Sequence, residues 1–72
     1  MKRQFAVVIE KGESSYGAWV PDLPGCIAAA NSVEEVERLI REAIAFHLER
    51  LVDQGESIPA ATTRVTSVAV PA

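Results

Sequence analysis

The chain has 72 residues, a formal charge of −3, 49% hydrophobic residues and 24% charged residues. This length allows one domain and excludes a two-lobed enzyme with a cleft between its halves. The composition is too apolar for a disordered chain and too evenly mixed for a membrane span, so we expect one soluble, cytoplasmic domain over residues 1–72. A core this small leaves a monomer only marginally stable, which predicts a homodimer or homotetramer.

The charge pattern and the rare residue types exclude further classes of function. Seven Lys and Arg stand against ten Asp and Glu, with no basic block beyond Lys2-Arg3, so direct binding of nucleic acid is not expected. Cys26 has neither a second cysteine to pair with nor a basic neighbour to activate it. His47 is the only histidine and falls on the apolar arc of a predicted helix, which favours packing over catalysis. We therefore predict no cofactor, no metal and no enzymatic activity.

Three short segments in the N-terminal half have strand character. Residues Gln4–Glu10 and Tyr16–Val20 are rich in β-branched and aromatic residues, and the polar, glycine-containing residues 11–15 between them are typical of a hairpin turn. Residues Pro21–Gly25 hold two prolines and a glycine, which cannot continue a strand ladder, so the chain reverses there. Residues Cys26–Ala30 then form a third strand by their place in the meander.

The C-terminal half predicts one long helix and a last strand. Ser32 and Glu35 form a capping box at the helix start, and residues 33–54 contain no glycine or proline before Gly55. Residues Ala60–Val70 are rich in threonine and valine, which predicts a final strand that can pair beside the first. The predicted fold class is α+β, in the order βββαβ, with an antiparallel sheet of about four strands and one long helix on one face.

The predicted sheet has apolar residues on both faces, and a single helix can cover only one of them. Strand alternation places Trp19 on the face opposite to Tyr16 and Ala18. The uncovered face therefore predicts a second polypeptide, either another copy of this chain or a different protein. The turn after Trp19 is a rigid loop that can present an acid and an apolar anchor to a basic partner. The candidate partner-binding residues are Glu10, Tyr16, Trp19, Asp22 and Leu23.

Two motifs in the chain resemble the HicB antitoxin family, and the similarity spans nearly the whole sequence. They read Tyr16-Gly17-Ala18-Trp19-Val20-Pro21-Asp22-Leu23-Pro24-Gly25-Cys26 and, after the predicted helix, Gly55-Glu56-Ser57-Ile58-Pro59. The resemblance implies a partial ribonuclease-H-like βββαβ fold that binds HicA, a small basic toxin that cleaves messenger RNA. It further implies that the antitoxin covers the RNA-binding surface and the catalytic histidine of that toxin.

The chain departs from the longer members of this family, which carry a DNA-binding domain after the shared fold. It ends just after the predicted last strand, so it resembles a short form that does not repress transcription by itself. The strands also contain one acidic residue, Glu10, whereas ribonuclease-H chemistry requires several carboxylates around divalent metal. The fold relationship therefore does not imply the catalysis.

Two functions are consistent with these observations. We predict an antitoxin-like protein that binds and occludes a small basic HicA-type toxin. The alternative is an orphan homo-oligomeric binding module for a small ligand or an unrelated protein, with no toxin partner. A neighbouring gene for a short, basic protein with one histidine favours the first function, and its absence favours the second.

Overall fold

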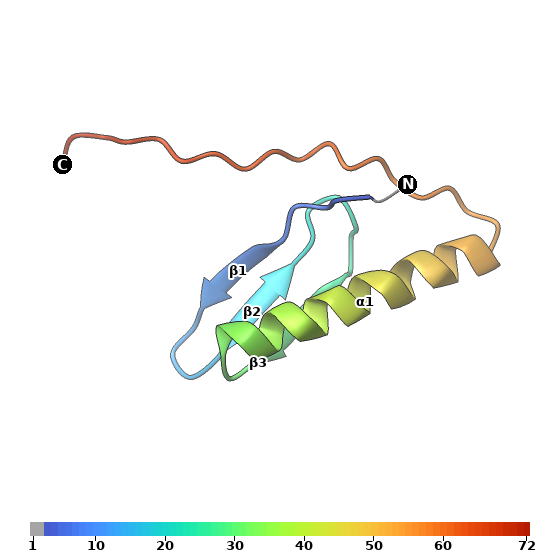
Figure 1. The fold of residues 1–72 in the computed structure, drawn as a ribbon, viewed down its shortest axis with the longest axis horizontal. Coiled ribbons are helices and arrows are strands. Elements are labelled where there is room, and N and C mark those ends of the chain that lie inside the picture. Colours follow the sequence, from blue (N-terminus) through green and yellow to red (C-terminus); the bar gives the residue numbers. More distant parts are fainter. Residues whose placement is uncertain (1–2) are drawn as a thin grey trace.

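The computed structural model describes residues 3–72, which form three strands and one helix (Figure 1). The elements are β1 (Val8–Lys11), β2 (Tyr16–Trp19), β3 (Ile27–Ala30) and α1 (Val33–Asp53). The strands form one antiparallel sheet in the order β1-β2-β3, and α1 lies across one face of it. This arrangement confirms the α+β class, with three strands rather than about four. Over residues 3–72 no helix is both long and apolar enough to cross a membrane.

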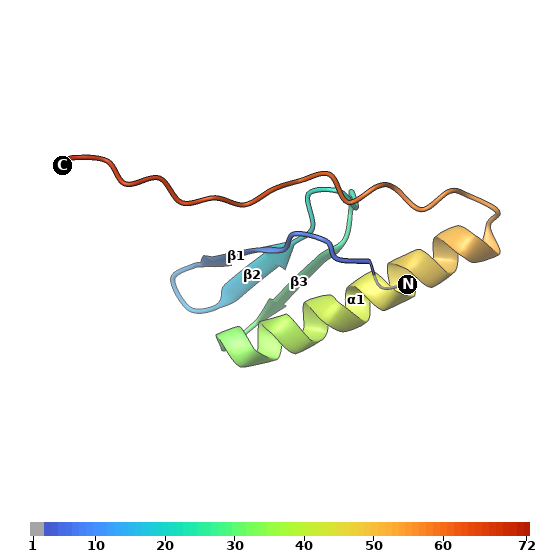
Figure 2. The ribbon, with the colours of Figure 1, turned by 45° about the horizontal axis from the view of Figure 1, so that its top comes forward.

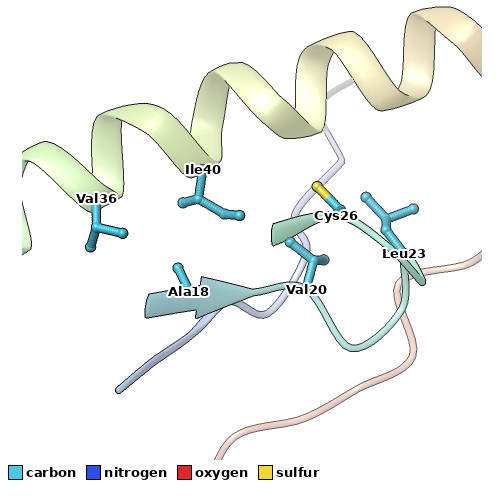
Figure 3. Close-up of a cluster of buried hydrophobic side chains, with 6 residues drawn as sticks. All are labelled: Ala18, Val20, Leu23, Cys26, Val36 and Ile40. Atoms are coloured by element: carbon cyan, nitrogen blue, oxygen red, sulfur yellow. The ribbon is translucent and has the colours of Figure 1, made fainter. Parts of the chain in front are cut away.

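A tight double turn joins β2 to β3. The Leu23 amide donates to the Val20 carbonyl at 3.0 Å, and the Cys26 amide donates to the Leu23 carbonyl at 3.0 Å. Gly25 has a φ of 86°, a conformation that residues with a side chain rarely adopt. The two prolines and the glycine therefore fix the route of the turn, and this route carries Leu23 back toward α1 (Figure 3).

The ends of α1 follow the predicted signals closely. The Ser32 hydroxyl accepts the Glu35 amide at 3.1 Å. The Glu35 carboxylate accepts the amide of Asn31 at 3.2 Å, one residue before the amide that a standard capping box uses. Gly55, with a φ of 72°, follows the last turn in the left-handed conformation that ends many helices. The helix is therefore one residue shorter than the predicted range 33–54.

The core lies between the first half of α1 and the sheet. Val36 and Ile40 point from α1 toward Ala18 on β2, while the double turn supplies side chains at the other end (Figure 3). Among residues 3–72, the six buried hydrophobic residues are Ala18, Val20, Leu23, Cys26, Val36 and Ile40. The second half of α1 extends past the strands (Figure 1), and Phe46 on it is 63% exposed. The fully buried helix residues thus lie in the first half of α1, while Ile44 and Leu48 in the second half are partly buried against the core.

The predicted last strand over Ala60–Val70 is wrong for the single chain. Residues 57–72, which we call the extended segment, leave α1 and run past the strands without joining the sheet (Figures 1 and 2). Threonine and valine favour an extended backbone, but a strand also needs a neighbour whose N–H and C=O groups lie within reach. The predicted first strand is shortened for the same reason, because only Val8–Lys11 of the N-terminal stretch pairs with β2.

Candidate protein-binding face

The sheet face opposite to α1, which we call the outer face, carries a row of apolar side chains. Val8 on β1 pairs with Trp19 on β2, which in turn pairs with Ile27 on β3, so one residue from each strand lies in the row. Trp19 is 38% exposed and Ile27 is 70% exposed, whereas Ala18, which points the other way, is buried. The predicted alternation along β2 is therefore correct. It leaves a tryptophan and an isoleucine uncovered side by side.

A shallow depression lies next to this row on the outer face. It measures about 580 Å³ and is lined by residues that include Glu10, Gly17, Trp19 and Ile27. Gly17 pairs with Glu10 on one side and Ala29 on the other, and a Cβ atom added at Gly17 would meet nothing within 4 Å. The missing side chain of Gly17 therefore contributes to the depression. The exposed carboxylate of Glu10 lies at its edge.

The structure separates the five predicted partner contacts into different environments. Glu10 and Trp19 lie together on the outer face. Tyr16 is half-buried and packs against the core on the face toward α1. Leu23 is 0% exposed, so the expectation that it serves as an exposed anchor is not met. The double turn directs this side chain into the core, which strand periodicity could not reveal because a turn has no regular alternation.

Asp22, the fifth predicted contact, binds the extended segment of its own chain. Its carboxylate accepts the Thr63 amide at 3.0 Å, the Thr63 hydroxyl at 2.8 Å and the Thr62 hydroxyl at 3.3 Å. These hydrogen bonds, first of all the one from the Thr63 amide, hold the pKa of Asp22 below its ordinary value of 3.8. Asp22 therefore holds the extended segment, at Thr62 and Thr63, against the double turn between β2 and β3.

The remaining chemically active residues do not assemble into a second site. Cys26 is 4% exposed, as predicted, and burial raises the pKa of its thiol. His47 is half-buried in the second half of α1. The described part of the chain, residues 3–72, has no group of three or more His, Cys, Asp or Glu side chains that could hold a metal ion.

Two residues of the outer face, Gly17 and Ile27, were not among the contacts predicted from the sequence. Both could have been found from alternation, because each neighbours a residue that faces the core. Ile27 follows the buried Cys26, and Gly17 precedes the buried Ala18. Gly17 has no side chain and was therefore not considered as a contact. The alanines after Ile27 suit a helix as well as a strand, so the strand alternation at Ile27 was not clear from the sequence.

Comparison with known proteins gives matches over most of the chain. Residues 5–71 match the family model described as a HicB-like antitoxin of bacterial toxin-antitoxin systems. A UPF0150 protein from Archaeoglobus fulgidus is 45% identical over 58 residues, which cover 76% of this chain and 84% of the relative. A UPF0150 protein from Helicobacter pylori is 51% identical over 41 residues, or 57% of either chain.

One further relative is longer than this chain. An uncharacterized 14.9 kDa protein from the rep-hol intergenic region of Haemophilus phage HP1 is 36% identical over 55 residues. The match covers 76% of this chain but 41% of the phage protein, so the chain spans less than half of that relative. No solved structure gives a significant match.

Proposed function

Because this chain belongs to the family of HicB-like antitoxins of bacterial toxin-antitoxin systems, we propose that it binds and occludes a small, basic, HicA-type toxin that cleaves messenger RNA. The observation that carries this proposal is the uncovered outer face, with Trp19 and Ile27 exposed beside Glu10. Exposed apolar and aromatic side chains next to polar ones are typical of protein-binding surfaces. Occlusion needs no catalytic group, and we propose no enzymatic activity.

The charge of the chain supports a basic partner. Ten Asp and Glu against seven Lys and Arg give a net charge of −3, which speeds the approach of a positively charged protein. Trp19 and Ile27 provide the apolar centre of the contact, and Glu10 provides an acidic group at its edge. Tyr16 and Leu23 act indirectly in this proposal, by supporting the sheet from the side of α1. Asp22 holds the extended segment near the end of β2.

The direct experiment is co-expression with a short, basic, histidine-containing protein encoded next to this gene. We expect the two chains to elute together in size-exclusion chromatography at micromolar concentration, and we expect this chain to relieve growth arrest caused by that protein. If no such neighbour is encoded, or if none elutes with this chain, the antitoxin proposal fails. The orphan binding module is then the better explanation of the open outer face.

A matched pair of variants tests whether the outer face makes the contact. Gly17→Leu puts a side chain into the depression, and the Cβ atom of that side chain meets nothing within 4 Å. Ala45→Leu adds the same side chain at an exposed position of α1. We expect Gly17→Leu to weaken the complex at least about tenfold, as loss of a central contact does, and Ala45→Leu to leave it unchanged. Equal affinities of the two variants, with unchanged thermal midpoints, would show that the toxin binds elsewhere.

A further inference from the structure

The extended segment has the residue pattern of a strand but no strand beside it. Val65, Val68 and Val70 are 75%, 76% and 72% exposed. Within residues 3–72, the hydrogen bonds that the extended segment makes are those of Thr62 and Thr63 to Asp22. The family match includes this segment, since it runs to residue 71. A shared unit of the family thus leaves a strand-forming sequence without a partner.

The single chain is also too extended and too exposed for its size. Its radius of gyration is 14.0 Å, whereas a compact chain of this length has about 11 Å. Its accessible surface is 5778 Å², whereas a folded monomer of this mass exposes about 4,400 Å². The excess is larger than the roughly 800 Å² that each partner buries in a typical stable interface. A second polypeptide can therefore cover this surface and form an interface of ordinary size.

The free edge of β1 offers a place for an additional strand. β1 and β3 are the two edges of the sheet, because the strand order is β1-β2-β3. β3 has four residues and leads within two residues into α1. β1 is preceded by residues 4–7, which have no strand partner in the described chain, so its edge is longer. This edge has about the length of residues 64–70.

A hollow between β1 and α1 fits the side chains of such a strand. It measures about 640 Å³, and its lining is half apolar: Phe5, Val7, Ile9, Ile40 and Ile44 line it together with Arg3, Gln4, Glu37 and Arg41. Phe5, Val7 and Ile9 alternate along the chain and therefore face the same way. A strand added to the edge of β1 places every second side chain over this hollow.

We propose that residues 64–70 of one copy add as a strand to the β1 edge of a second copy, and that the second copy returns the contact. Val68 and Val70 lie two residues apart, so both can fill the hollow between β1 and α1 of the partner. Asp22 holds Thr62 and Thr63, which directly precede the pairing residues, at the turn of its own chain. The exchange pairs the free backbone groups of β1 and covers exposed valines in a closed dimer.

One substitution distinguishes a segment that pairs with a second copy from a segment that stays in solvent. Val68→Asp changes a side chain that is 76% exposed in the single chain, where it has little effect, but it puts a charge into the proposed hollow. Ser57→Asp places the same charge at an exposed position before the pairing residues. In light scattering after size-exclusion chromatography, we expect twice the 7.8 kDa chain mass for the unsubstituted protein and Ser57→Asp, and a single chain mass for Val68→Asp. A monomeric unsubstituted protein, or an intact Val68→Asp dimer, overturns the proposal.

The edge that receives the segment is tested separately. In a dimer of one isotopically labelled and one unlabelled copy, intermolecular NOEs should connect the methyl groups of Val68 and Val70 with Phe5 and Val7. Contacts with β3, or contacts within one copy only, overturn the assignment to β1. The proposal does not rest on toxin binding, because both measurements use this chain alone. Its failure is therefore distinguishable from failure of the antitoxin proposal.

Discussion

At the scale of single residues, Asp22 gives the clearest prediction of pH dependence. Its folded-state pKa lies below 3.8, so its bonds to Thr63 are at full strength above that value and are lost as the pH falls through the lowered pKa. We expect NMR titration to give Asp22 a pKa below 3.8. We also expect Asp22→Asn to speed hydrogen exchange of the Thr63 amide at neutral pH, while Asp53→Asn does not. A pKa at or above 3.8 would contradict the anchoring contact.

Individual residues also show what a sequence can and cannot predict about the candidate site. Trp19 was placed correctly because strand alternation fixes its face once Ala18 is assigned to the core. Leu23 was placed wrongly because its direction depends on the hydrogen bonds of the double turn and on the φ of Gly25, neither of which follows a period. Asp22 was expected to meet a partner, but threonines 40 and 41 residues later in the chain bind it. No local pattern predicts contacts over such a distance.

At the scale of elements, the start of α1 provides a test of local stability. The Ser32 hydroxyl accepts the Glu35 amide, one of the donors that the helix itself cannot satisfy. We expect Ser32→Ala to lower the free energy of unfolding by about 1 kcal/mol, measured by urea denaturation. In a domain this small that change lowers the thermal midpoint by roughly 4–8 °C. Ser57→Ala, which removes an exposed hydroxyl outside the helix, should change neither value, and equal effects of both variants would exclude a capping role.

The helix and strands could be predicted from the sequence where residues close in the chain determine their bounds. The helix range was nearly correct because Ser32 and Gly55 are short-range start and stop signals. The strand over Ala60–Val70 was not, because its composition determines an extended backbone but not which edge it joins. Within residues 3–72 the segment pairs with no strand, so we expect its partner strand in a second copy of the chain.

At the scale of the whole molecule, the small core makes folding and association interdependent. The described part of the chain has six buried hydrophobic residues, and several of its large apolar side chains remain exposed. If two copies exchange their extended segments, dilution shifts the equilibrium toward unfolded single chains. With an unfolding enthalpy of about 100 kcal/mol per dimer, the thermal midpoint should fall by about 5 °C for each tenfold dilution. Calorimetry over a hundredfold range of concentration measures this slope.

The slope should disappear in Val68→Asp and persist in Ser57→Asp, because only the charge at residue 68 enters the contact between copies. A midpoint independent of concentration in the unsubstituted protein would mean that one copy folds alone despite its exposed surface.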